Sequence, residues 1–325
     1  MKQISINCFL MLLYCLSGFS QSQDSLSTKN DTLQHNQKKG IFSTSWGVIK
    51  NSVLTVPQDF VQIGHGVSDN WKKTAIYTAG IAGLVLVDKY TTEFYQDEIE
   101  SAIDYHLPNI SPKKEHPFII DQFLSGTDAY ITYSLLGIYA GSFATNYEKG
   151  QYAAVNSFKA LAYSYVISHL LLKSVIGRHR PDLTLSDGNP PEYPYTSNPF
   201  DFGNLSGIEF DRGQYGTAMP SFHATAYYAV AKVMAMEFNN YWIPYTVVTG
   251  IFLSDIRGHK HWVSDMVAGG ILGTLIGGSI VKSSRKRRDI QDISSNVTSW
   301  TDKIEFKLVP QISGNFVGLH LMGSF

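Results

Sequence analysis

The chain carries six apolar stretches, each long enough for several turns of helix and joined mostly by short loops. They cover residues 74–87, 129–145, 152–176, 218–236, 241–253 and 263–281. Apolar helices linked by short connections bury their apolar faces against their chain neighbours. The sequence therefore predicts an all-α fold, a bundle of about six core helices. A long segment rich in Pro, Gly, Asn and Tyr, residues 182–218, interrupts the bundle and is expected to shape the entrance to a site.

The start of the chain is typical of an exported protein. Lys2 and an apolar run over 4–18 predict a secretory signal peptide, residues 1–20, with cleavage before Gln21. Both cysteines, Cys8 and Cys15, lie within it, so no disulfide is expected in the mature chain. Residues 21–65 are predicted to form a polar linker and one amphipathic helix over 41–61. Residues 66–288 then form the helical domain.

The tail, residues 289–325, changes period. Apolar residues alternate from Ile304 to Leu308 and again from Val317 to Phe325, with a turn at Gly314 between them. Alternation of this kind predicts a β-hairpin. One hairpin cannot close a membrane barrel, so we expect it to pack on the bundle or to pair with another chain.

Composition limits the partners and the compartment. The net charge of −1 over 325 residues gives no nucleic-acid footprint, and no protein partner is predicted. A bilayer span needs about 20 apolar residues, which the 74–87 stretch lacks. Treating that stretch as non-spanning places three segments with candidate site residues, 173–181, 220–223 and 254–265, in the periplasm. The basic cluster 285–288 then lies in the cytoplasm. We expect a periplasm-facing site in a bacterial cell envelope, on a membrane-associated protein. A soluble periplasmic bundle is the alternative.

The first motif segment, residues 173–181, lies where a helix is expected to end, at Gly177. Lys173 and Arg180, seven residues apart, would project from one face about 10 Å apart if the helix persists. A lysine and an arginine suit the oxygens of a phosphate. The simpler interpretation is a basic helix C-terminus, which the helix dipole favours on its own.

The second motif segment, Pro220-Ser221-Phe222-His223, lies where a helix is expected to begin. Free backbone N–H groups at a helix start attract an anion, and the Ser221 hydroxyl adds a donor. His223, in the same turn, could give a proton to a leaving oxygen. Taken alone, the segment could equally be a serine cap followed by a packed histidine.

The third motif segment runs from Ser254 to Asp265. His261 and Asp265 are four residues apart, so we place them on one face of a helix. The carboxylate would then fix the imidazole tautomer and leave the other ring nitrogen as a nucleophile. No carboxylate or cysteine cluster suggests a metal, so none is expected.

Together the three segments resemble the type 2 phosphatidic acid phosphatase superfamily, PAP2. This superfamily holds lipid phosphatases, bacterial acid phosphatases and vanadium haloperoxidases. Its pattern is K-x6-R-P, P-S-G-H and S-R-x5-H-x3-D. Here Phe222 stands where the pattern has glycine, and Asp255 stands where it has arginine. An acid there would repel the substrate, and Arg257 is the candidate replacement.

The resemblance implies two-step phosphoryl transfer without a metal. His261 attacks phosphorus, Asp265 orients it, and His223 protonates the leaving alkoxide and later activates water. The residues implied to bind the phosphate group of the substrate are Lys173, Arg180, Ser221, Phe222 and Arg257. The sequence thus predicts a phosphoric ester hydrolase acting on a phosphomonoester or diphosphate, of a lipid or a small molecule. The alternatives are a vanadate-dependent haloperoxidase, a soluble acid phosphatase and a non-catalytic membrane module.

Overall fold

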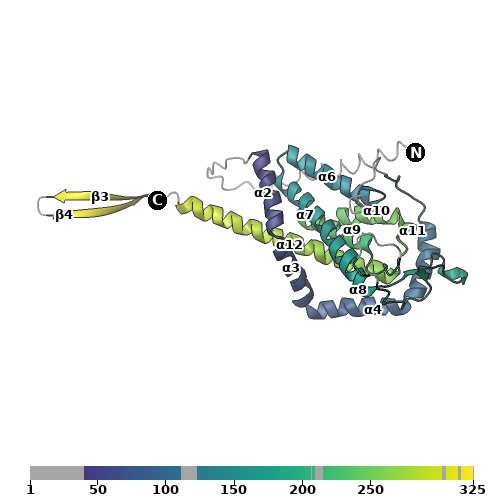
Figure 1. The fold of residues 1–325 in the computed structure, drawn as a ribbon. Coiled ribbons are helices and arrows are strands. Elements are labelled where there is room, and N and C mark those ends of the chain that lie inside the picture. The colour runs from purple at the N-terminus through teal and green to yellow at the C-terminus, as the bar shows by residue number, and fades with distance from the viewer. Residues whose placement is uncertain are drawn as a thin grey trace.

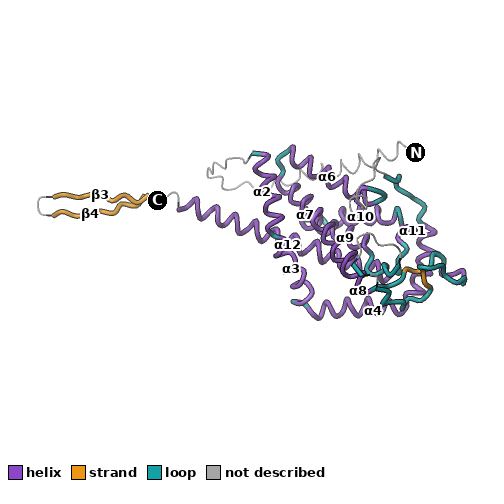
Figure 2. Tube along the Cα trace, in the orientation of Figure 1, coloured by secondary structure: helices purple, strands orange, loops and turns teal. Residues whose placement is uncertain are grey.

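A computed structural model gives the fold of the protein (Figure 1). It describes residues 40–110, 123–205, 207–208, 215–301, 305–313 and 316–324, and no side chains beyond residue 290. The predicted signal peptide and the polar linker up to residue 39 lie outside the described residues. Helix makes up most of the described chain (Figure 2), which confirms the all-α prediction.

Two helices form the N-terminal arm, where the sequence predicted one. Helix α2 covers Ile41–Leu54 and α3 covers Val56–Ser68. Pro57 lies in the first turn of α3, where its missing N–H costs no hydrogen bond, whereas inside a longer helix its ring would clash with the preceding turn. The prediction of a single helix over 41–61 is therefore wrong. The predicted boundary between 65 and 66 falls inside α3.

Most of each of the six predicted stretches lies in a helical segment, although residues 218–221 precede α9. The bounds of these segments are α4 Trp71–Phe94, α6 Asp128–Ala144, α7 Glu148–Ser164 continued by η2 Tyr165–Leu172 and α8 Lys173–Ile176, α9 Phe222–Phe238, α10 Trp242–Leu253, and α12 Val263–Thr301. Helix α4 has 24 residues, about 36 Å at 1.5 Å per residue. Although it is long, it is not among the described helices that are long and apolar enough to cross a membrane, as expected for residues 74–87.

Helices α9 and α12 pack closely because glycines recur along α12. A Cβ atom at Gly273 would lie 2.2 Å from the Thr225 carbonyl oxygen, and one at Gly277 would lie 2.3 Å from that of Ala229. Only glycine permits such an approach at these positions. The contact brings the start of α9, with the second motif segment, against the start of α12, with the third.

The connections around the site are short elements and loops. Helix η1 covers Tyr95–Glu100 and follows α4. Residues 101–110 follow η1, and residues 111–122, between them and α6, lie outside the described chain. Most other helices are joined by one to three residues, as expected. Between α8 and α9 lie β1 Arg180–Pro181, η3 Leu185–Asp187 and β2 Tyr195–Thr196, and the two strands pair in parallel. Helix α11 covers Ile256–His259.

The chain ends in the predicted hairpin. Strand β3 covers Glu305–Ser313 and β4 covers Phe316–Ser324, and they pair antiparallel from Glu305 opposite Ser324 to Ser313 opposite Phe316. The hairpin lies beyond the end of α12, away from the other helices (Figure 1). Helix α12 itself continues through the predicted boundary between 288 and 289.

One helix segment in the described residues, Val263–Ile290, is long and apolar enough to cross a membrane. More than half of its most apolar part is buried inside the protein, as in the core helix of a soluble bundle. This is weak support for membrane association.

Candidate active site

A buried arginine organises the site. The Arg178 guanidinium donates to Asp265 Oδ1 at 2.7 Å, to Asp88 Oδ2 at 2.8 Å and to Ser264 Oγ at 2.8 Å. Its Nε and Nη2 also donate to the Pro199 carbonyl oxygen, at 3.1 and 2.7 Å. These five hydrogen bonds account for all five guanidinium N–H groups. Arg178 therefore anchors the site and has no donor left for a substrate.

Side chains of α4 complete the start of α12. The first N–H groups of a helix have no partner within it. Here the Val263 N–H donates to Thr92 Oγ1 and the Ser264 N–H donates to Asp88 Oδ1, both at 3.1 Å. The Ser264 hydroxyl donates to Asp88 Oδ2 as well. Asp88 thus joins α4, Arg178 and α12, a role that was missed in the sequence. The available signal was an acid at the end of an apolar stretch.

The predicted nucleophile and its orienting acid lie together. His261 is 4% exposed, and its Nδ1 lies 3.7 Å from Asp265 Oδ2, longer than a hydrogen bond. Asp265 is fully buried, and its oxygens already accept from Arg178 and from the Trp262 N–H. His261 precedes α12, so the two residues do not share a helix face as expected. The contact arises because the chain turns at Lys260, whose φ is 47°.

The second motif segment meets the third through backbone atoms. Ser221 is the buried N-cap of α9, and its hydroxyl oxygen lies 3.5 Å from the Ala224 N–H that it accepts. The Ser221 N–H donates to the Asp265 carbonyl oxygen at 3.0 Å. The start of α9 is therefore fixed against the residue that faces His261.

Phe222 points into the core rather than toward an anion. It is 2% exposed, and its ring lies about 6 Å, centroid to centroid, from the rings of Phe123, Tyr165 and His169. The side chain supports the first turn of α9, so only its backbone N–H could serve a substrate.

His223 has an acidic partner that was not identified in the sequence. Its Nε2 lies 3.2 Å from Oδ2 of Asp128, the first residue of α6. Burial raises the pKa of the nearby Asp255, an effect that His223 and His106 oppose and Asp128 reinforces. Asp128 therefore contacts His223, and Asp255, at the position where the family pattern has an arginine, is close enough to interact with it electrostatically. Asp128 begins an apolar helix, which was the one signal in the sequence.

The predicted phosphate-binding cations separate into two groups. Lys173 is buried at the start of α8, and Gly177 ends that helix with φ at 55°, as expected. Arg180 Nε donates to Thr217 Oγ1 at 3.1 Å. Burial lowers the pKa of Arg180 to about 10, and the negative charge of Asp265 opposes this shift. Lys173 is therefore buried and Arg180 half-buried, so neither side chain lies at the protein surface.

Arg257 lies outside this group. Its side chain is exposed, and Nη2 donates to the Glu100 carbonyl oxygen at 3.3 Å, at the end of η1. It is thereby directed to the protein surface. Lys260 lies closer to Arg180 through a shared neighbour. Its Nζ lies 3.3 Å from the hydroxyl of Tyr195, and Tyr195 is paired with Arg180 across β1 and β2.

The fold brings the three motif segments together. Arg178 joins the first to the third, Ser221 joins the second to the third, and Thr217 lies beside both Arg178 and Arg180 in the first. Within the described residues, no group of three or more His, Cys, Asp and Glu side chains is placed to hold a metal ion.

The family model of the PAP2 superfamily matches residues 153–289. This part of the chain runs from α7 into α12 and holds all three motif segments, and the match supports membership of the PAP2 superfamily. Searches among curated proteins and solved structures gave no significant match. The match confirms the resemblance seen in the motifs and supports a phosphatase-type, hydrolytic function in general.

Proposed function

We propose that the protein is a metal-independent phosphatase that hydrolyses a phosphomonoester or diphosphate of a lipid through a phosphohistidine intermediate. One observation carries the proposal. The fully buried ion pairs Asp88–Arg178 and Arg178–Asp265 hold the Asp265 carboxylate beside Nδ1 of His261. The backbone carbonyl of Asp265 also accepts a hydrogen bond from the N–H of Ser221, at the N-terminus of α9. A nucleophile with a fixed orienting acid and an anion-binding helix end are the parts that such a transfer requires.

The reaction follows from these positions in two steps. Nε2 of His261 attacks phosphorus while the bond from phosphorus to the leaving oxygen breaks, and His223 gives that oxygen its proton. Water then attacks the phosphohistidine, His223 takes a proton from it, and phosphate leaves as His261 is restored. Lys173 and Arg180 neutralise the oxygens, because this kind of transition state needs positioning and charge neutralisation more than covalent chemistry.

The acids around His223 affect the choice between the alternatives. Asp128 orients the imidazole, and Asp255 occupies the position of the missing arginine. A haloperoxidase must hold vanadate permanently through dense positive charge, and an acid beside the pocket opposes this. The arrangement therefore supports transient phosphate binding over a resident vanadate.

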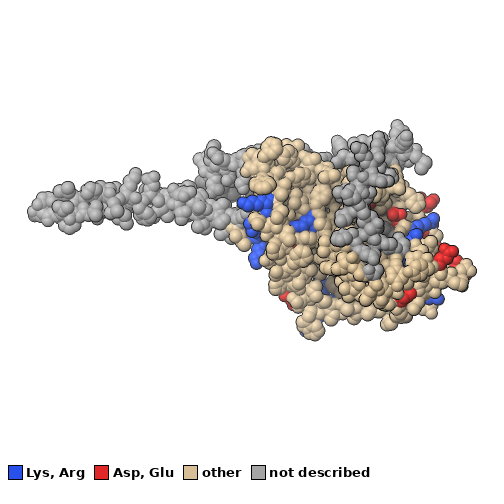
Figure 3. Space-filling model, in the orientation of Figure 1, with Lys and Arg blue, Asp and Glu red and all other residues tan. Residues whose placement is uncertain are grey.

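A lipid substrate is supported by apolar surface on the outer helices. Phe42 on α2 is 81% exposed, and Ile76 and Leu86 on α4 are 68% and 69% exposed. Exposed apolar side chains of this size are typical of surfaces that contact a protein, a ligand or a membrane, and a membrane is the contact that fits a lipid substrate. Most visible basic side chains gather where α12 leaves the other helices, and most acidic ones lie at the opposite end (Figure 3). We propose that the basic end faces the cytoplasm and the motif end the periplasm of a bacterial envelope.

The test is phosphate release by purified protein from a lipid phosphate, an isoprenoid diphosphate and a chromogenic phosphomonoester, with chelator present. We expect release from at least one substrate and loss of it in His261→Ala, with an intermediate on the histidine trapped by rapid acid-free quench and intact mass. Activity that requires added metal, or that survives His261→Ala, contradicts the mechanism. Bromide oxidation appearing only with vanadate would establish the haloperoxidase alternative.

A further inference from the structure

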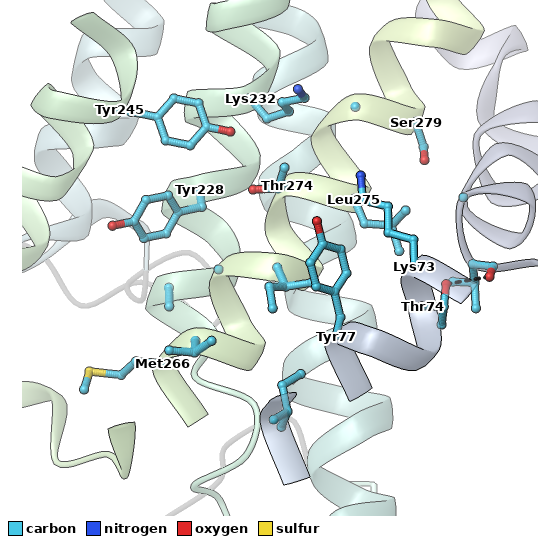
Figure 4. A pocket seen from close by; sticks show the side chains of 18 of the residues that line it. Lys73, Thr74, Tyr77, Tyr228, Lys232, Tyr245, Met266, Thr274, Leu275 and Ser279 are labelled. Carbon is cyan, nitrogen blue, oxygen red and sulfur yellow. Dashed lines mark hydrogen bonds between the residues drawn. The ribbon is translucent and has the colours of Figure 1, made fainter. Parts of the chain in front are cut away.

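A groove with a volume of about 1020 Å³ lies between helices α4, α9, α10 and α12, beside the motif residues rather than among them (Figure 4). Its wall on α9 consists of residues four apart, which share one face of the helix. The wall on α12 repeats in the same way. These rows are Ala224, Tyr228, Lys232 and Met236 on α9, and Met266, Gly270, Thr274, Gly278 and Lys282 on α12, beside a second α12 row of Val267, Ile271, Leu275 and Ser279.

The groove is long and narrow. The lining residues of α12 from Met266 to Lys282 span 16 residues, about 24 Å of helix. Gly270 and Gly278 keep this wall low, since a Cβ at either position would already touch the ring of Tyr228 or the stem of Lys232, at 3.5 Å. Such a slot accepts a flexible hydrocarbon chain lying along the helices.

The two ends of the groove differ in charge. At one end, Ala224 and Met266 directly follow the candidate catalytic residues His223 and Asp265. At the other end lie Lys73, Lys232 and Lys282. Lys73 and Lys232 lie toward one end and Met266 toward the other, with tyrosine rings between them (Figure 4). The groove is thus apolar along its length and basic at the end remote from the catalytic residues.

The lysines at this end carry charge that is available to a ligand. The Lys73 ammonium lies 5.5 Å from the centre of the Tyr77 ring, and that of Lys232 lies 4.8 Å from the centre of the Tyr241 ring. Such contacts hold an ammonium group without neutralising it. Among the described residues no carboxylate forms an ion pair with either lysine. Asp69 is the acid near Lys282.

We propose that this groove binds one anionic phospholipid, with an acyl chain along α9 and α12 and the phosphate on Lys73, Lys232 and Lys282. The site is separate from the catalytic pocket and does not depend on the proposed reaction. A phosphate is favoured as the head group because three lysines line the same end of the groove. A hydrocarbon chain is favoured as the tail because about 24 Å of apolar wall leads away from them.

The test is a lipid titration followed by native mass spectrometry, on the full chain carrying His261→Ala so that no turnover can consume the probe. The probe is dioleoylphosphatidylglycerol, and dioleoylphosphatidylcholine carries the same chains without net charge. The head-group variant combines Lys73→Gln, Lys232→Gln and Lys282→Gln. Its matched control combines Lys50→Gln, Lys72→Gln and Lys89→Gln, three exposed lysines outside the groove.

We expect the parent to bind one phosphatidylglycerol tightly. Each lysine beside the lipid phosphate is expected to contribute about fivefold to the affinity, so the head-group variant should bind roughly 100-fold more weakly. The control triple is expected to stay within about fivefold of the parent, since each of its lysines lies away from the lipid phosphate. A second variant, Gly270→Leu, fills the groove without removing charge and should weaken binding about tenfold by displacing one or two methylenes.

Three results would overturn the proposal. Equal binding of phosphatidylcholine, or equal loss in both lysine triples, would show that the lysines do not select the head group. Unchanged affinity in Gly270→Leu would show that no chain enters the groove. A dimer in the parent that Gly270→Leu dissociates would identify a second copy of the chain as the occupant.

Discussion

Replacing Arg178 by methionine tests the most consequential contact in the structure. Methionine keeps much of the length and apolar character of the arginine stem while removing the charge and all five donors. Asp88 and Asp265, both fully buried, would then lose their shared cation. Breaking a buried ion pair by removing one partner costs about 3–5 kcal/mol, because a charge is left without compensation in the interior.

The expected loss can be worked from the remaining contacts. Asp88 keeps the Ser264 N–H and hydroxyl, and Asp265 keeps the Trp262 N–H, so neither carboxylate is left without a donor. We therefore expect Arg178→Met to lower the free energy of unfolding by about 4 kcal/mol. Arg178→Lys should lose about 2 kcal/mol, since a point charge cannot replace the fork that reaches both acids.

Chemical unfolding in detergent, followed by tryptophan fluorescence, measures both variants. Arg257→Met is the matched control, because this arginine is exposed and its loss should change stability by under about 0.5 kcal/mol. In an Asp88→Asn background, Arg178→Met should cost about 1–2 kcal/mol less, since one carboxylate fewer is left unpaired. The reasoning is refuted if Arg178→Met is as mild as the control, or if Asp88→Asn leaves its cost unchanged.

Three further predictions concern the reaction and the pH dependence. Asp128→Asn should lower kcat at least tenfold with little change in KM, because the substitution disturbs the orientation of the proposed proton donor His223. Steady-state kinetics measure both constants, and an unchanged kcat excludes this role for Asp128. Arg180→Ala should raise KM 10- to 100-fold, whereas Arg257→Ala should change it less than twofold; equal effects would return Arg257 to the phosphate site. Burial raises the pKa of Glu100 from 4.5 to about 7, so the folded state binds a proton more tightly than the unfolded state and stability falls as pH rises from about 4.5 to 7. Glu100→Gln should flatten that slope in unfolding curves, and an equally steep curve would show that the carboxyl group is not buried.

Local sequence was sufficient for the elements of the bundle. Long apolar stretches favour helix, and most of each of the six stretches is helical. Gly177 and Ser221 mark a helix end and a helix start as expected. The three motif segments could be recognised because their residue types and spacing follow a family pattern. Pro57 shows the limit of this reasoning, since the same helical pattern was divided by one residue.

The partners of the site residues could not be predicted in the same way. Asp88 and Asp128 lie about 90 and 95 residues from the groups they contact, and nothing local distinguishes them from solvated acids. Arg178 and Arg180 are two residues apart and equally basic. All five N–H groups of Arg178 are used in hydrogen bonds, whereas Arg180 begins the short strand β1 and donates to Thr217 beside the proposed phosphate site.

The sequence by itself determined the helices, the hairpin and the candidates for nucleophile, orienting acid and proton donor, because these depend on residues close together along the chain. Tertiary structure decided which cation anchors Asp265, which acid faces His223, that Arg257 turns to the surface, and that a basic-ended groove follows α9 and α12. These outcomes depend on which helix faces meet, and burial then selects the partner that satisfies each charge.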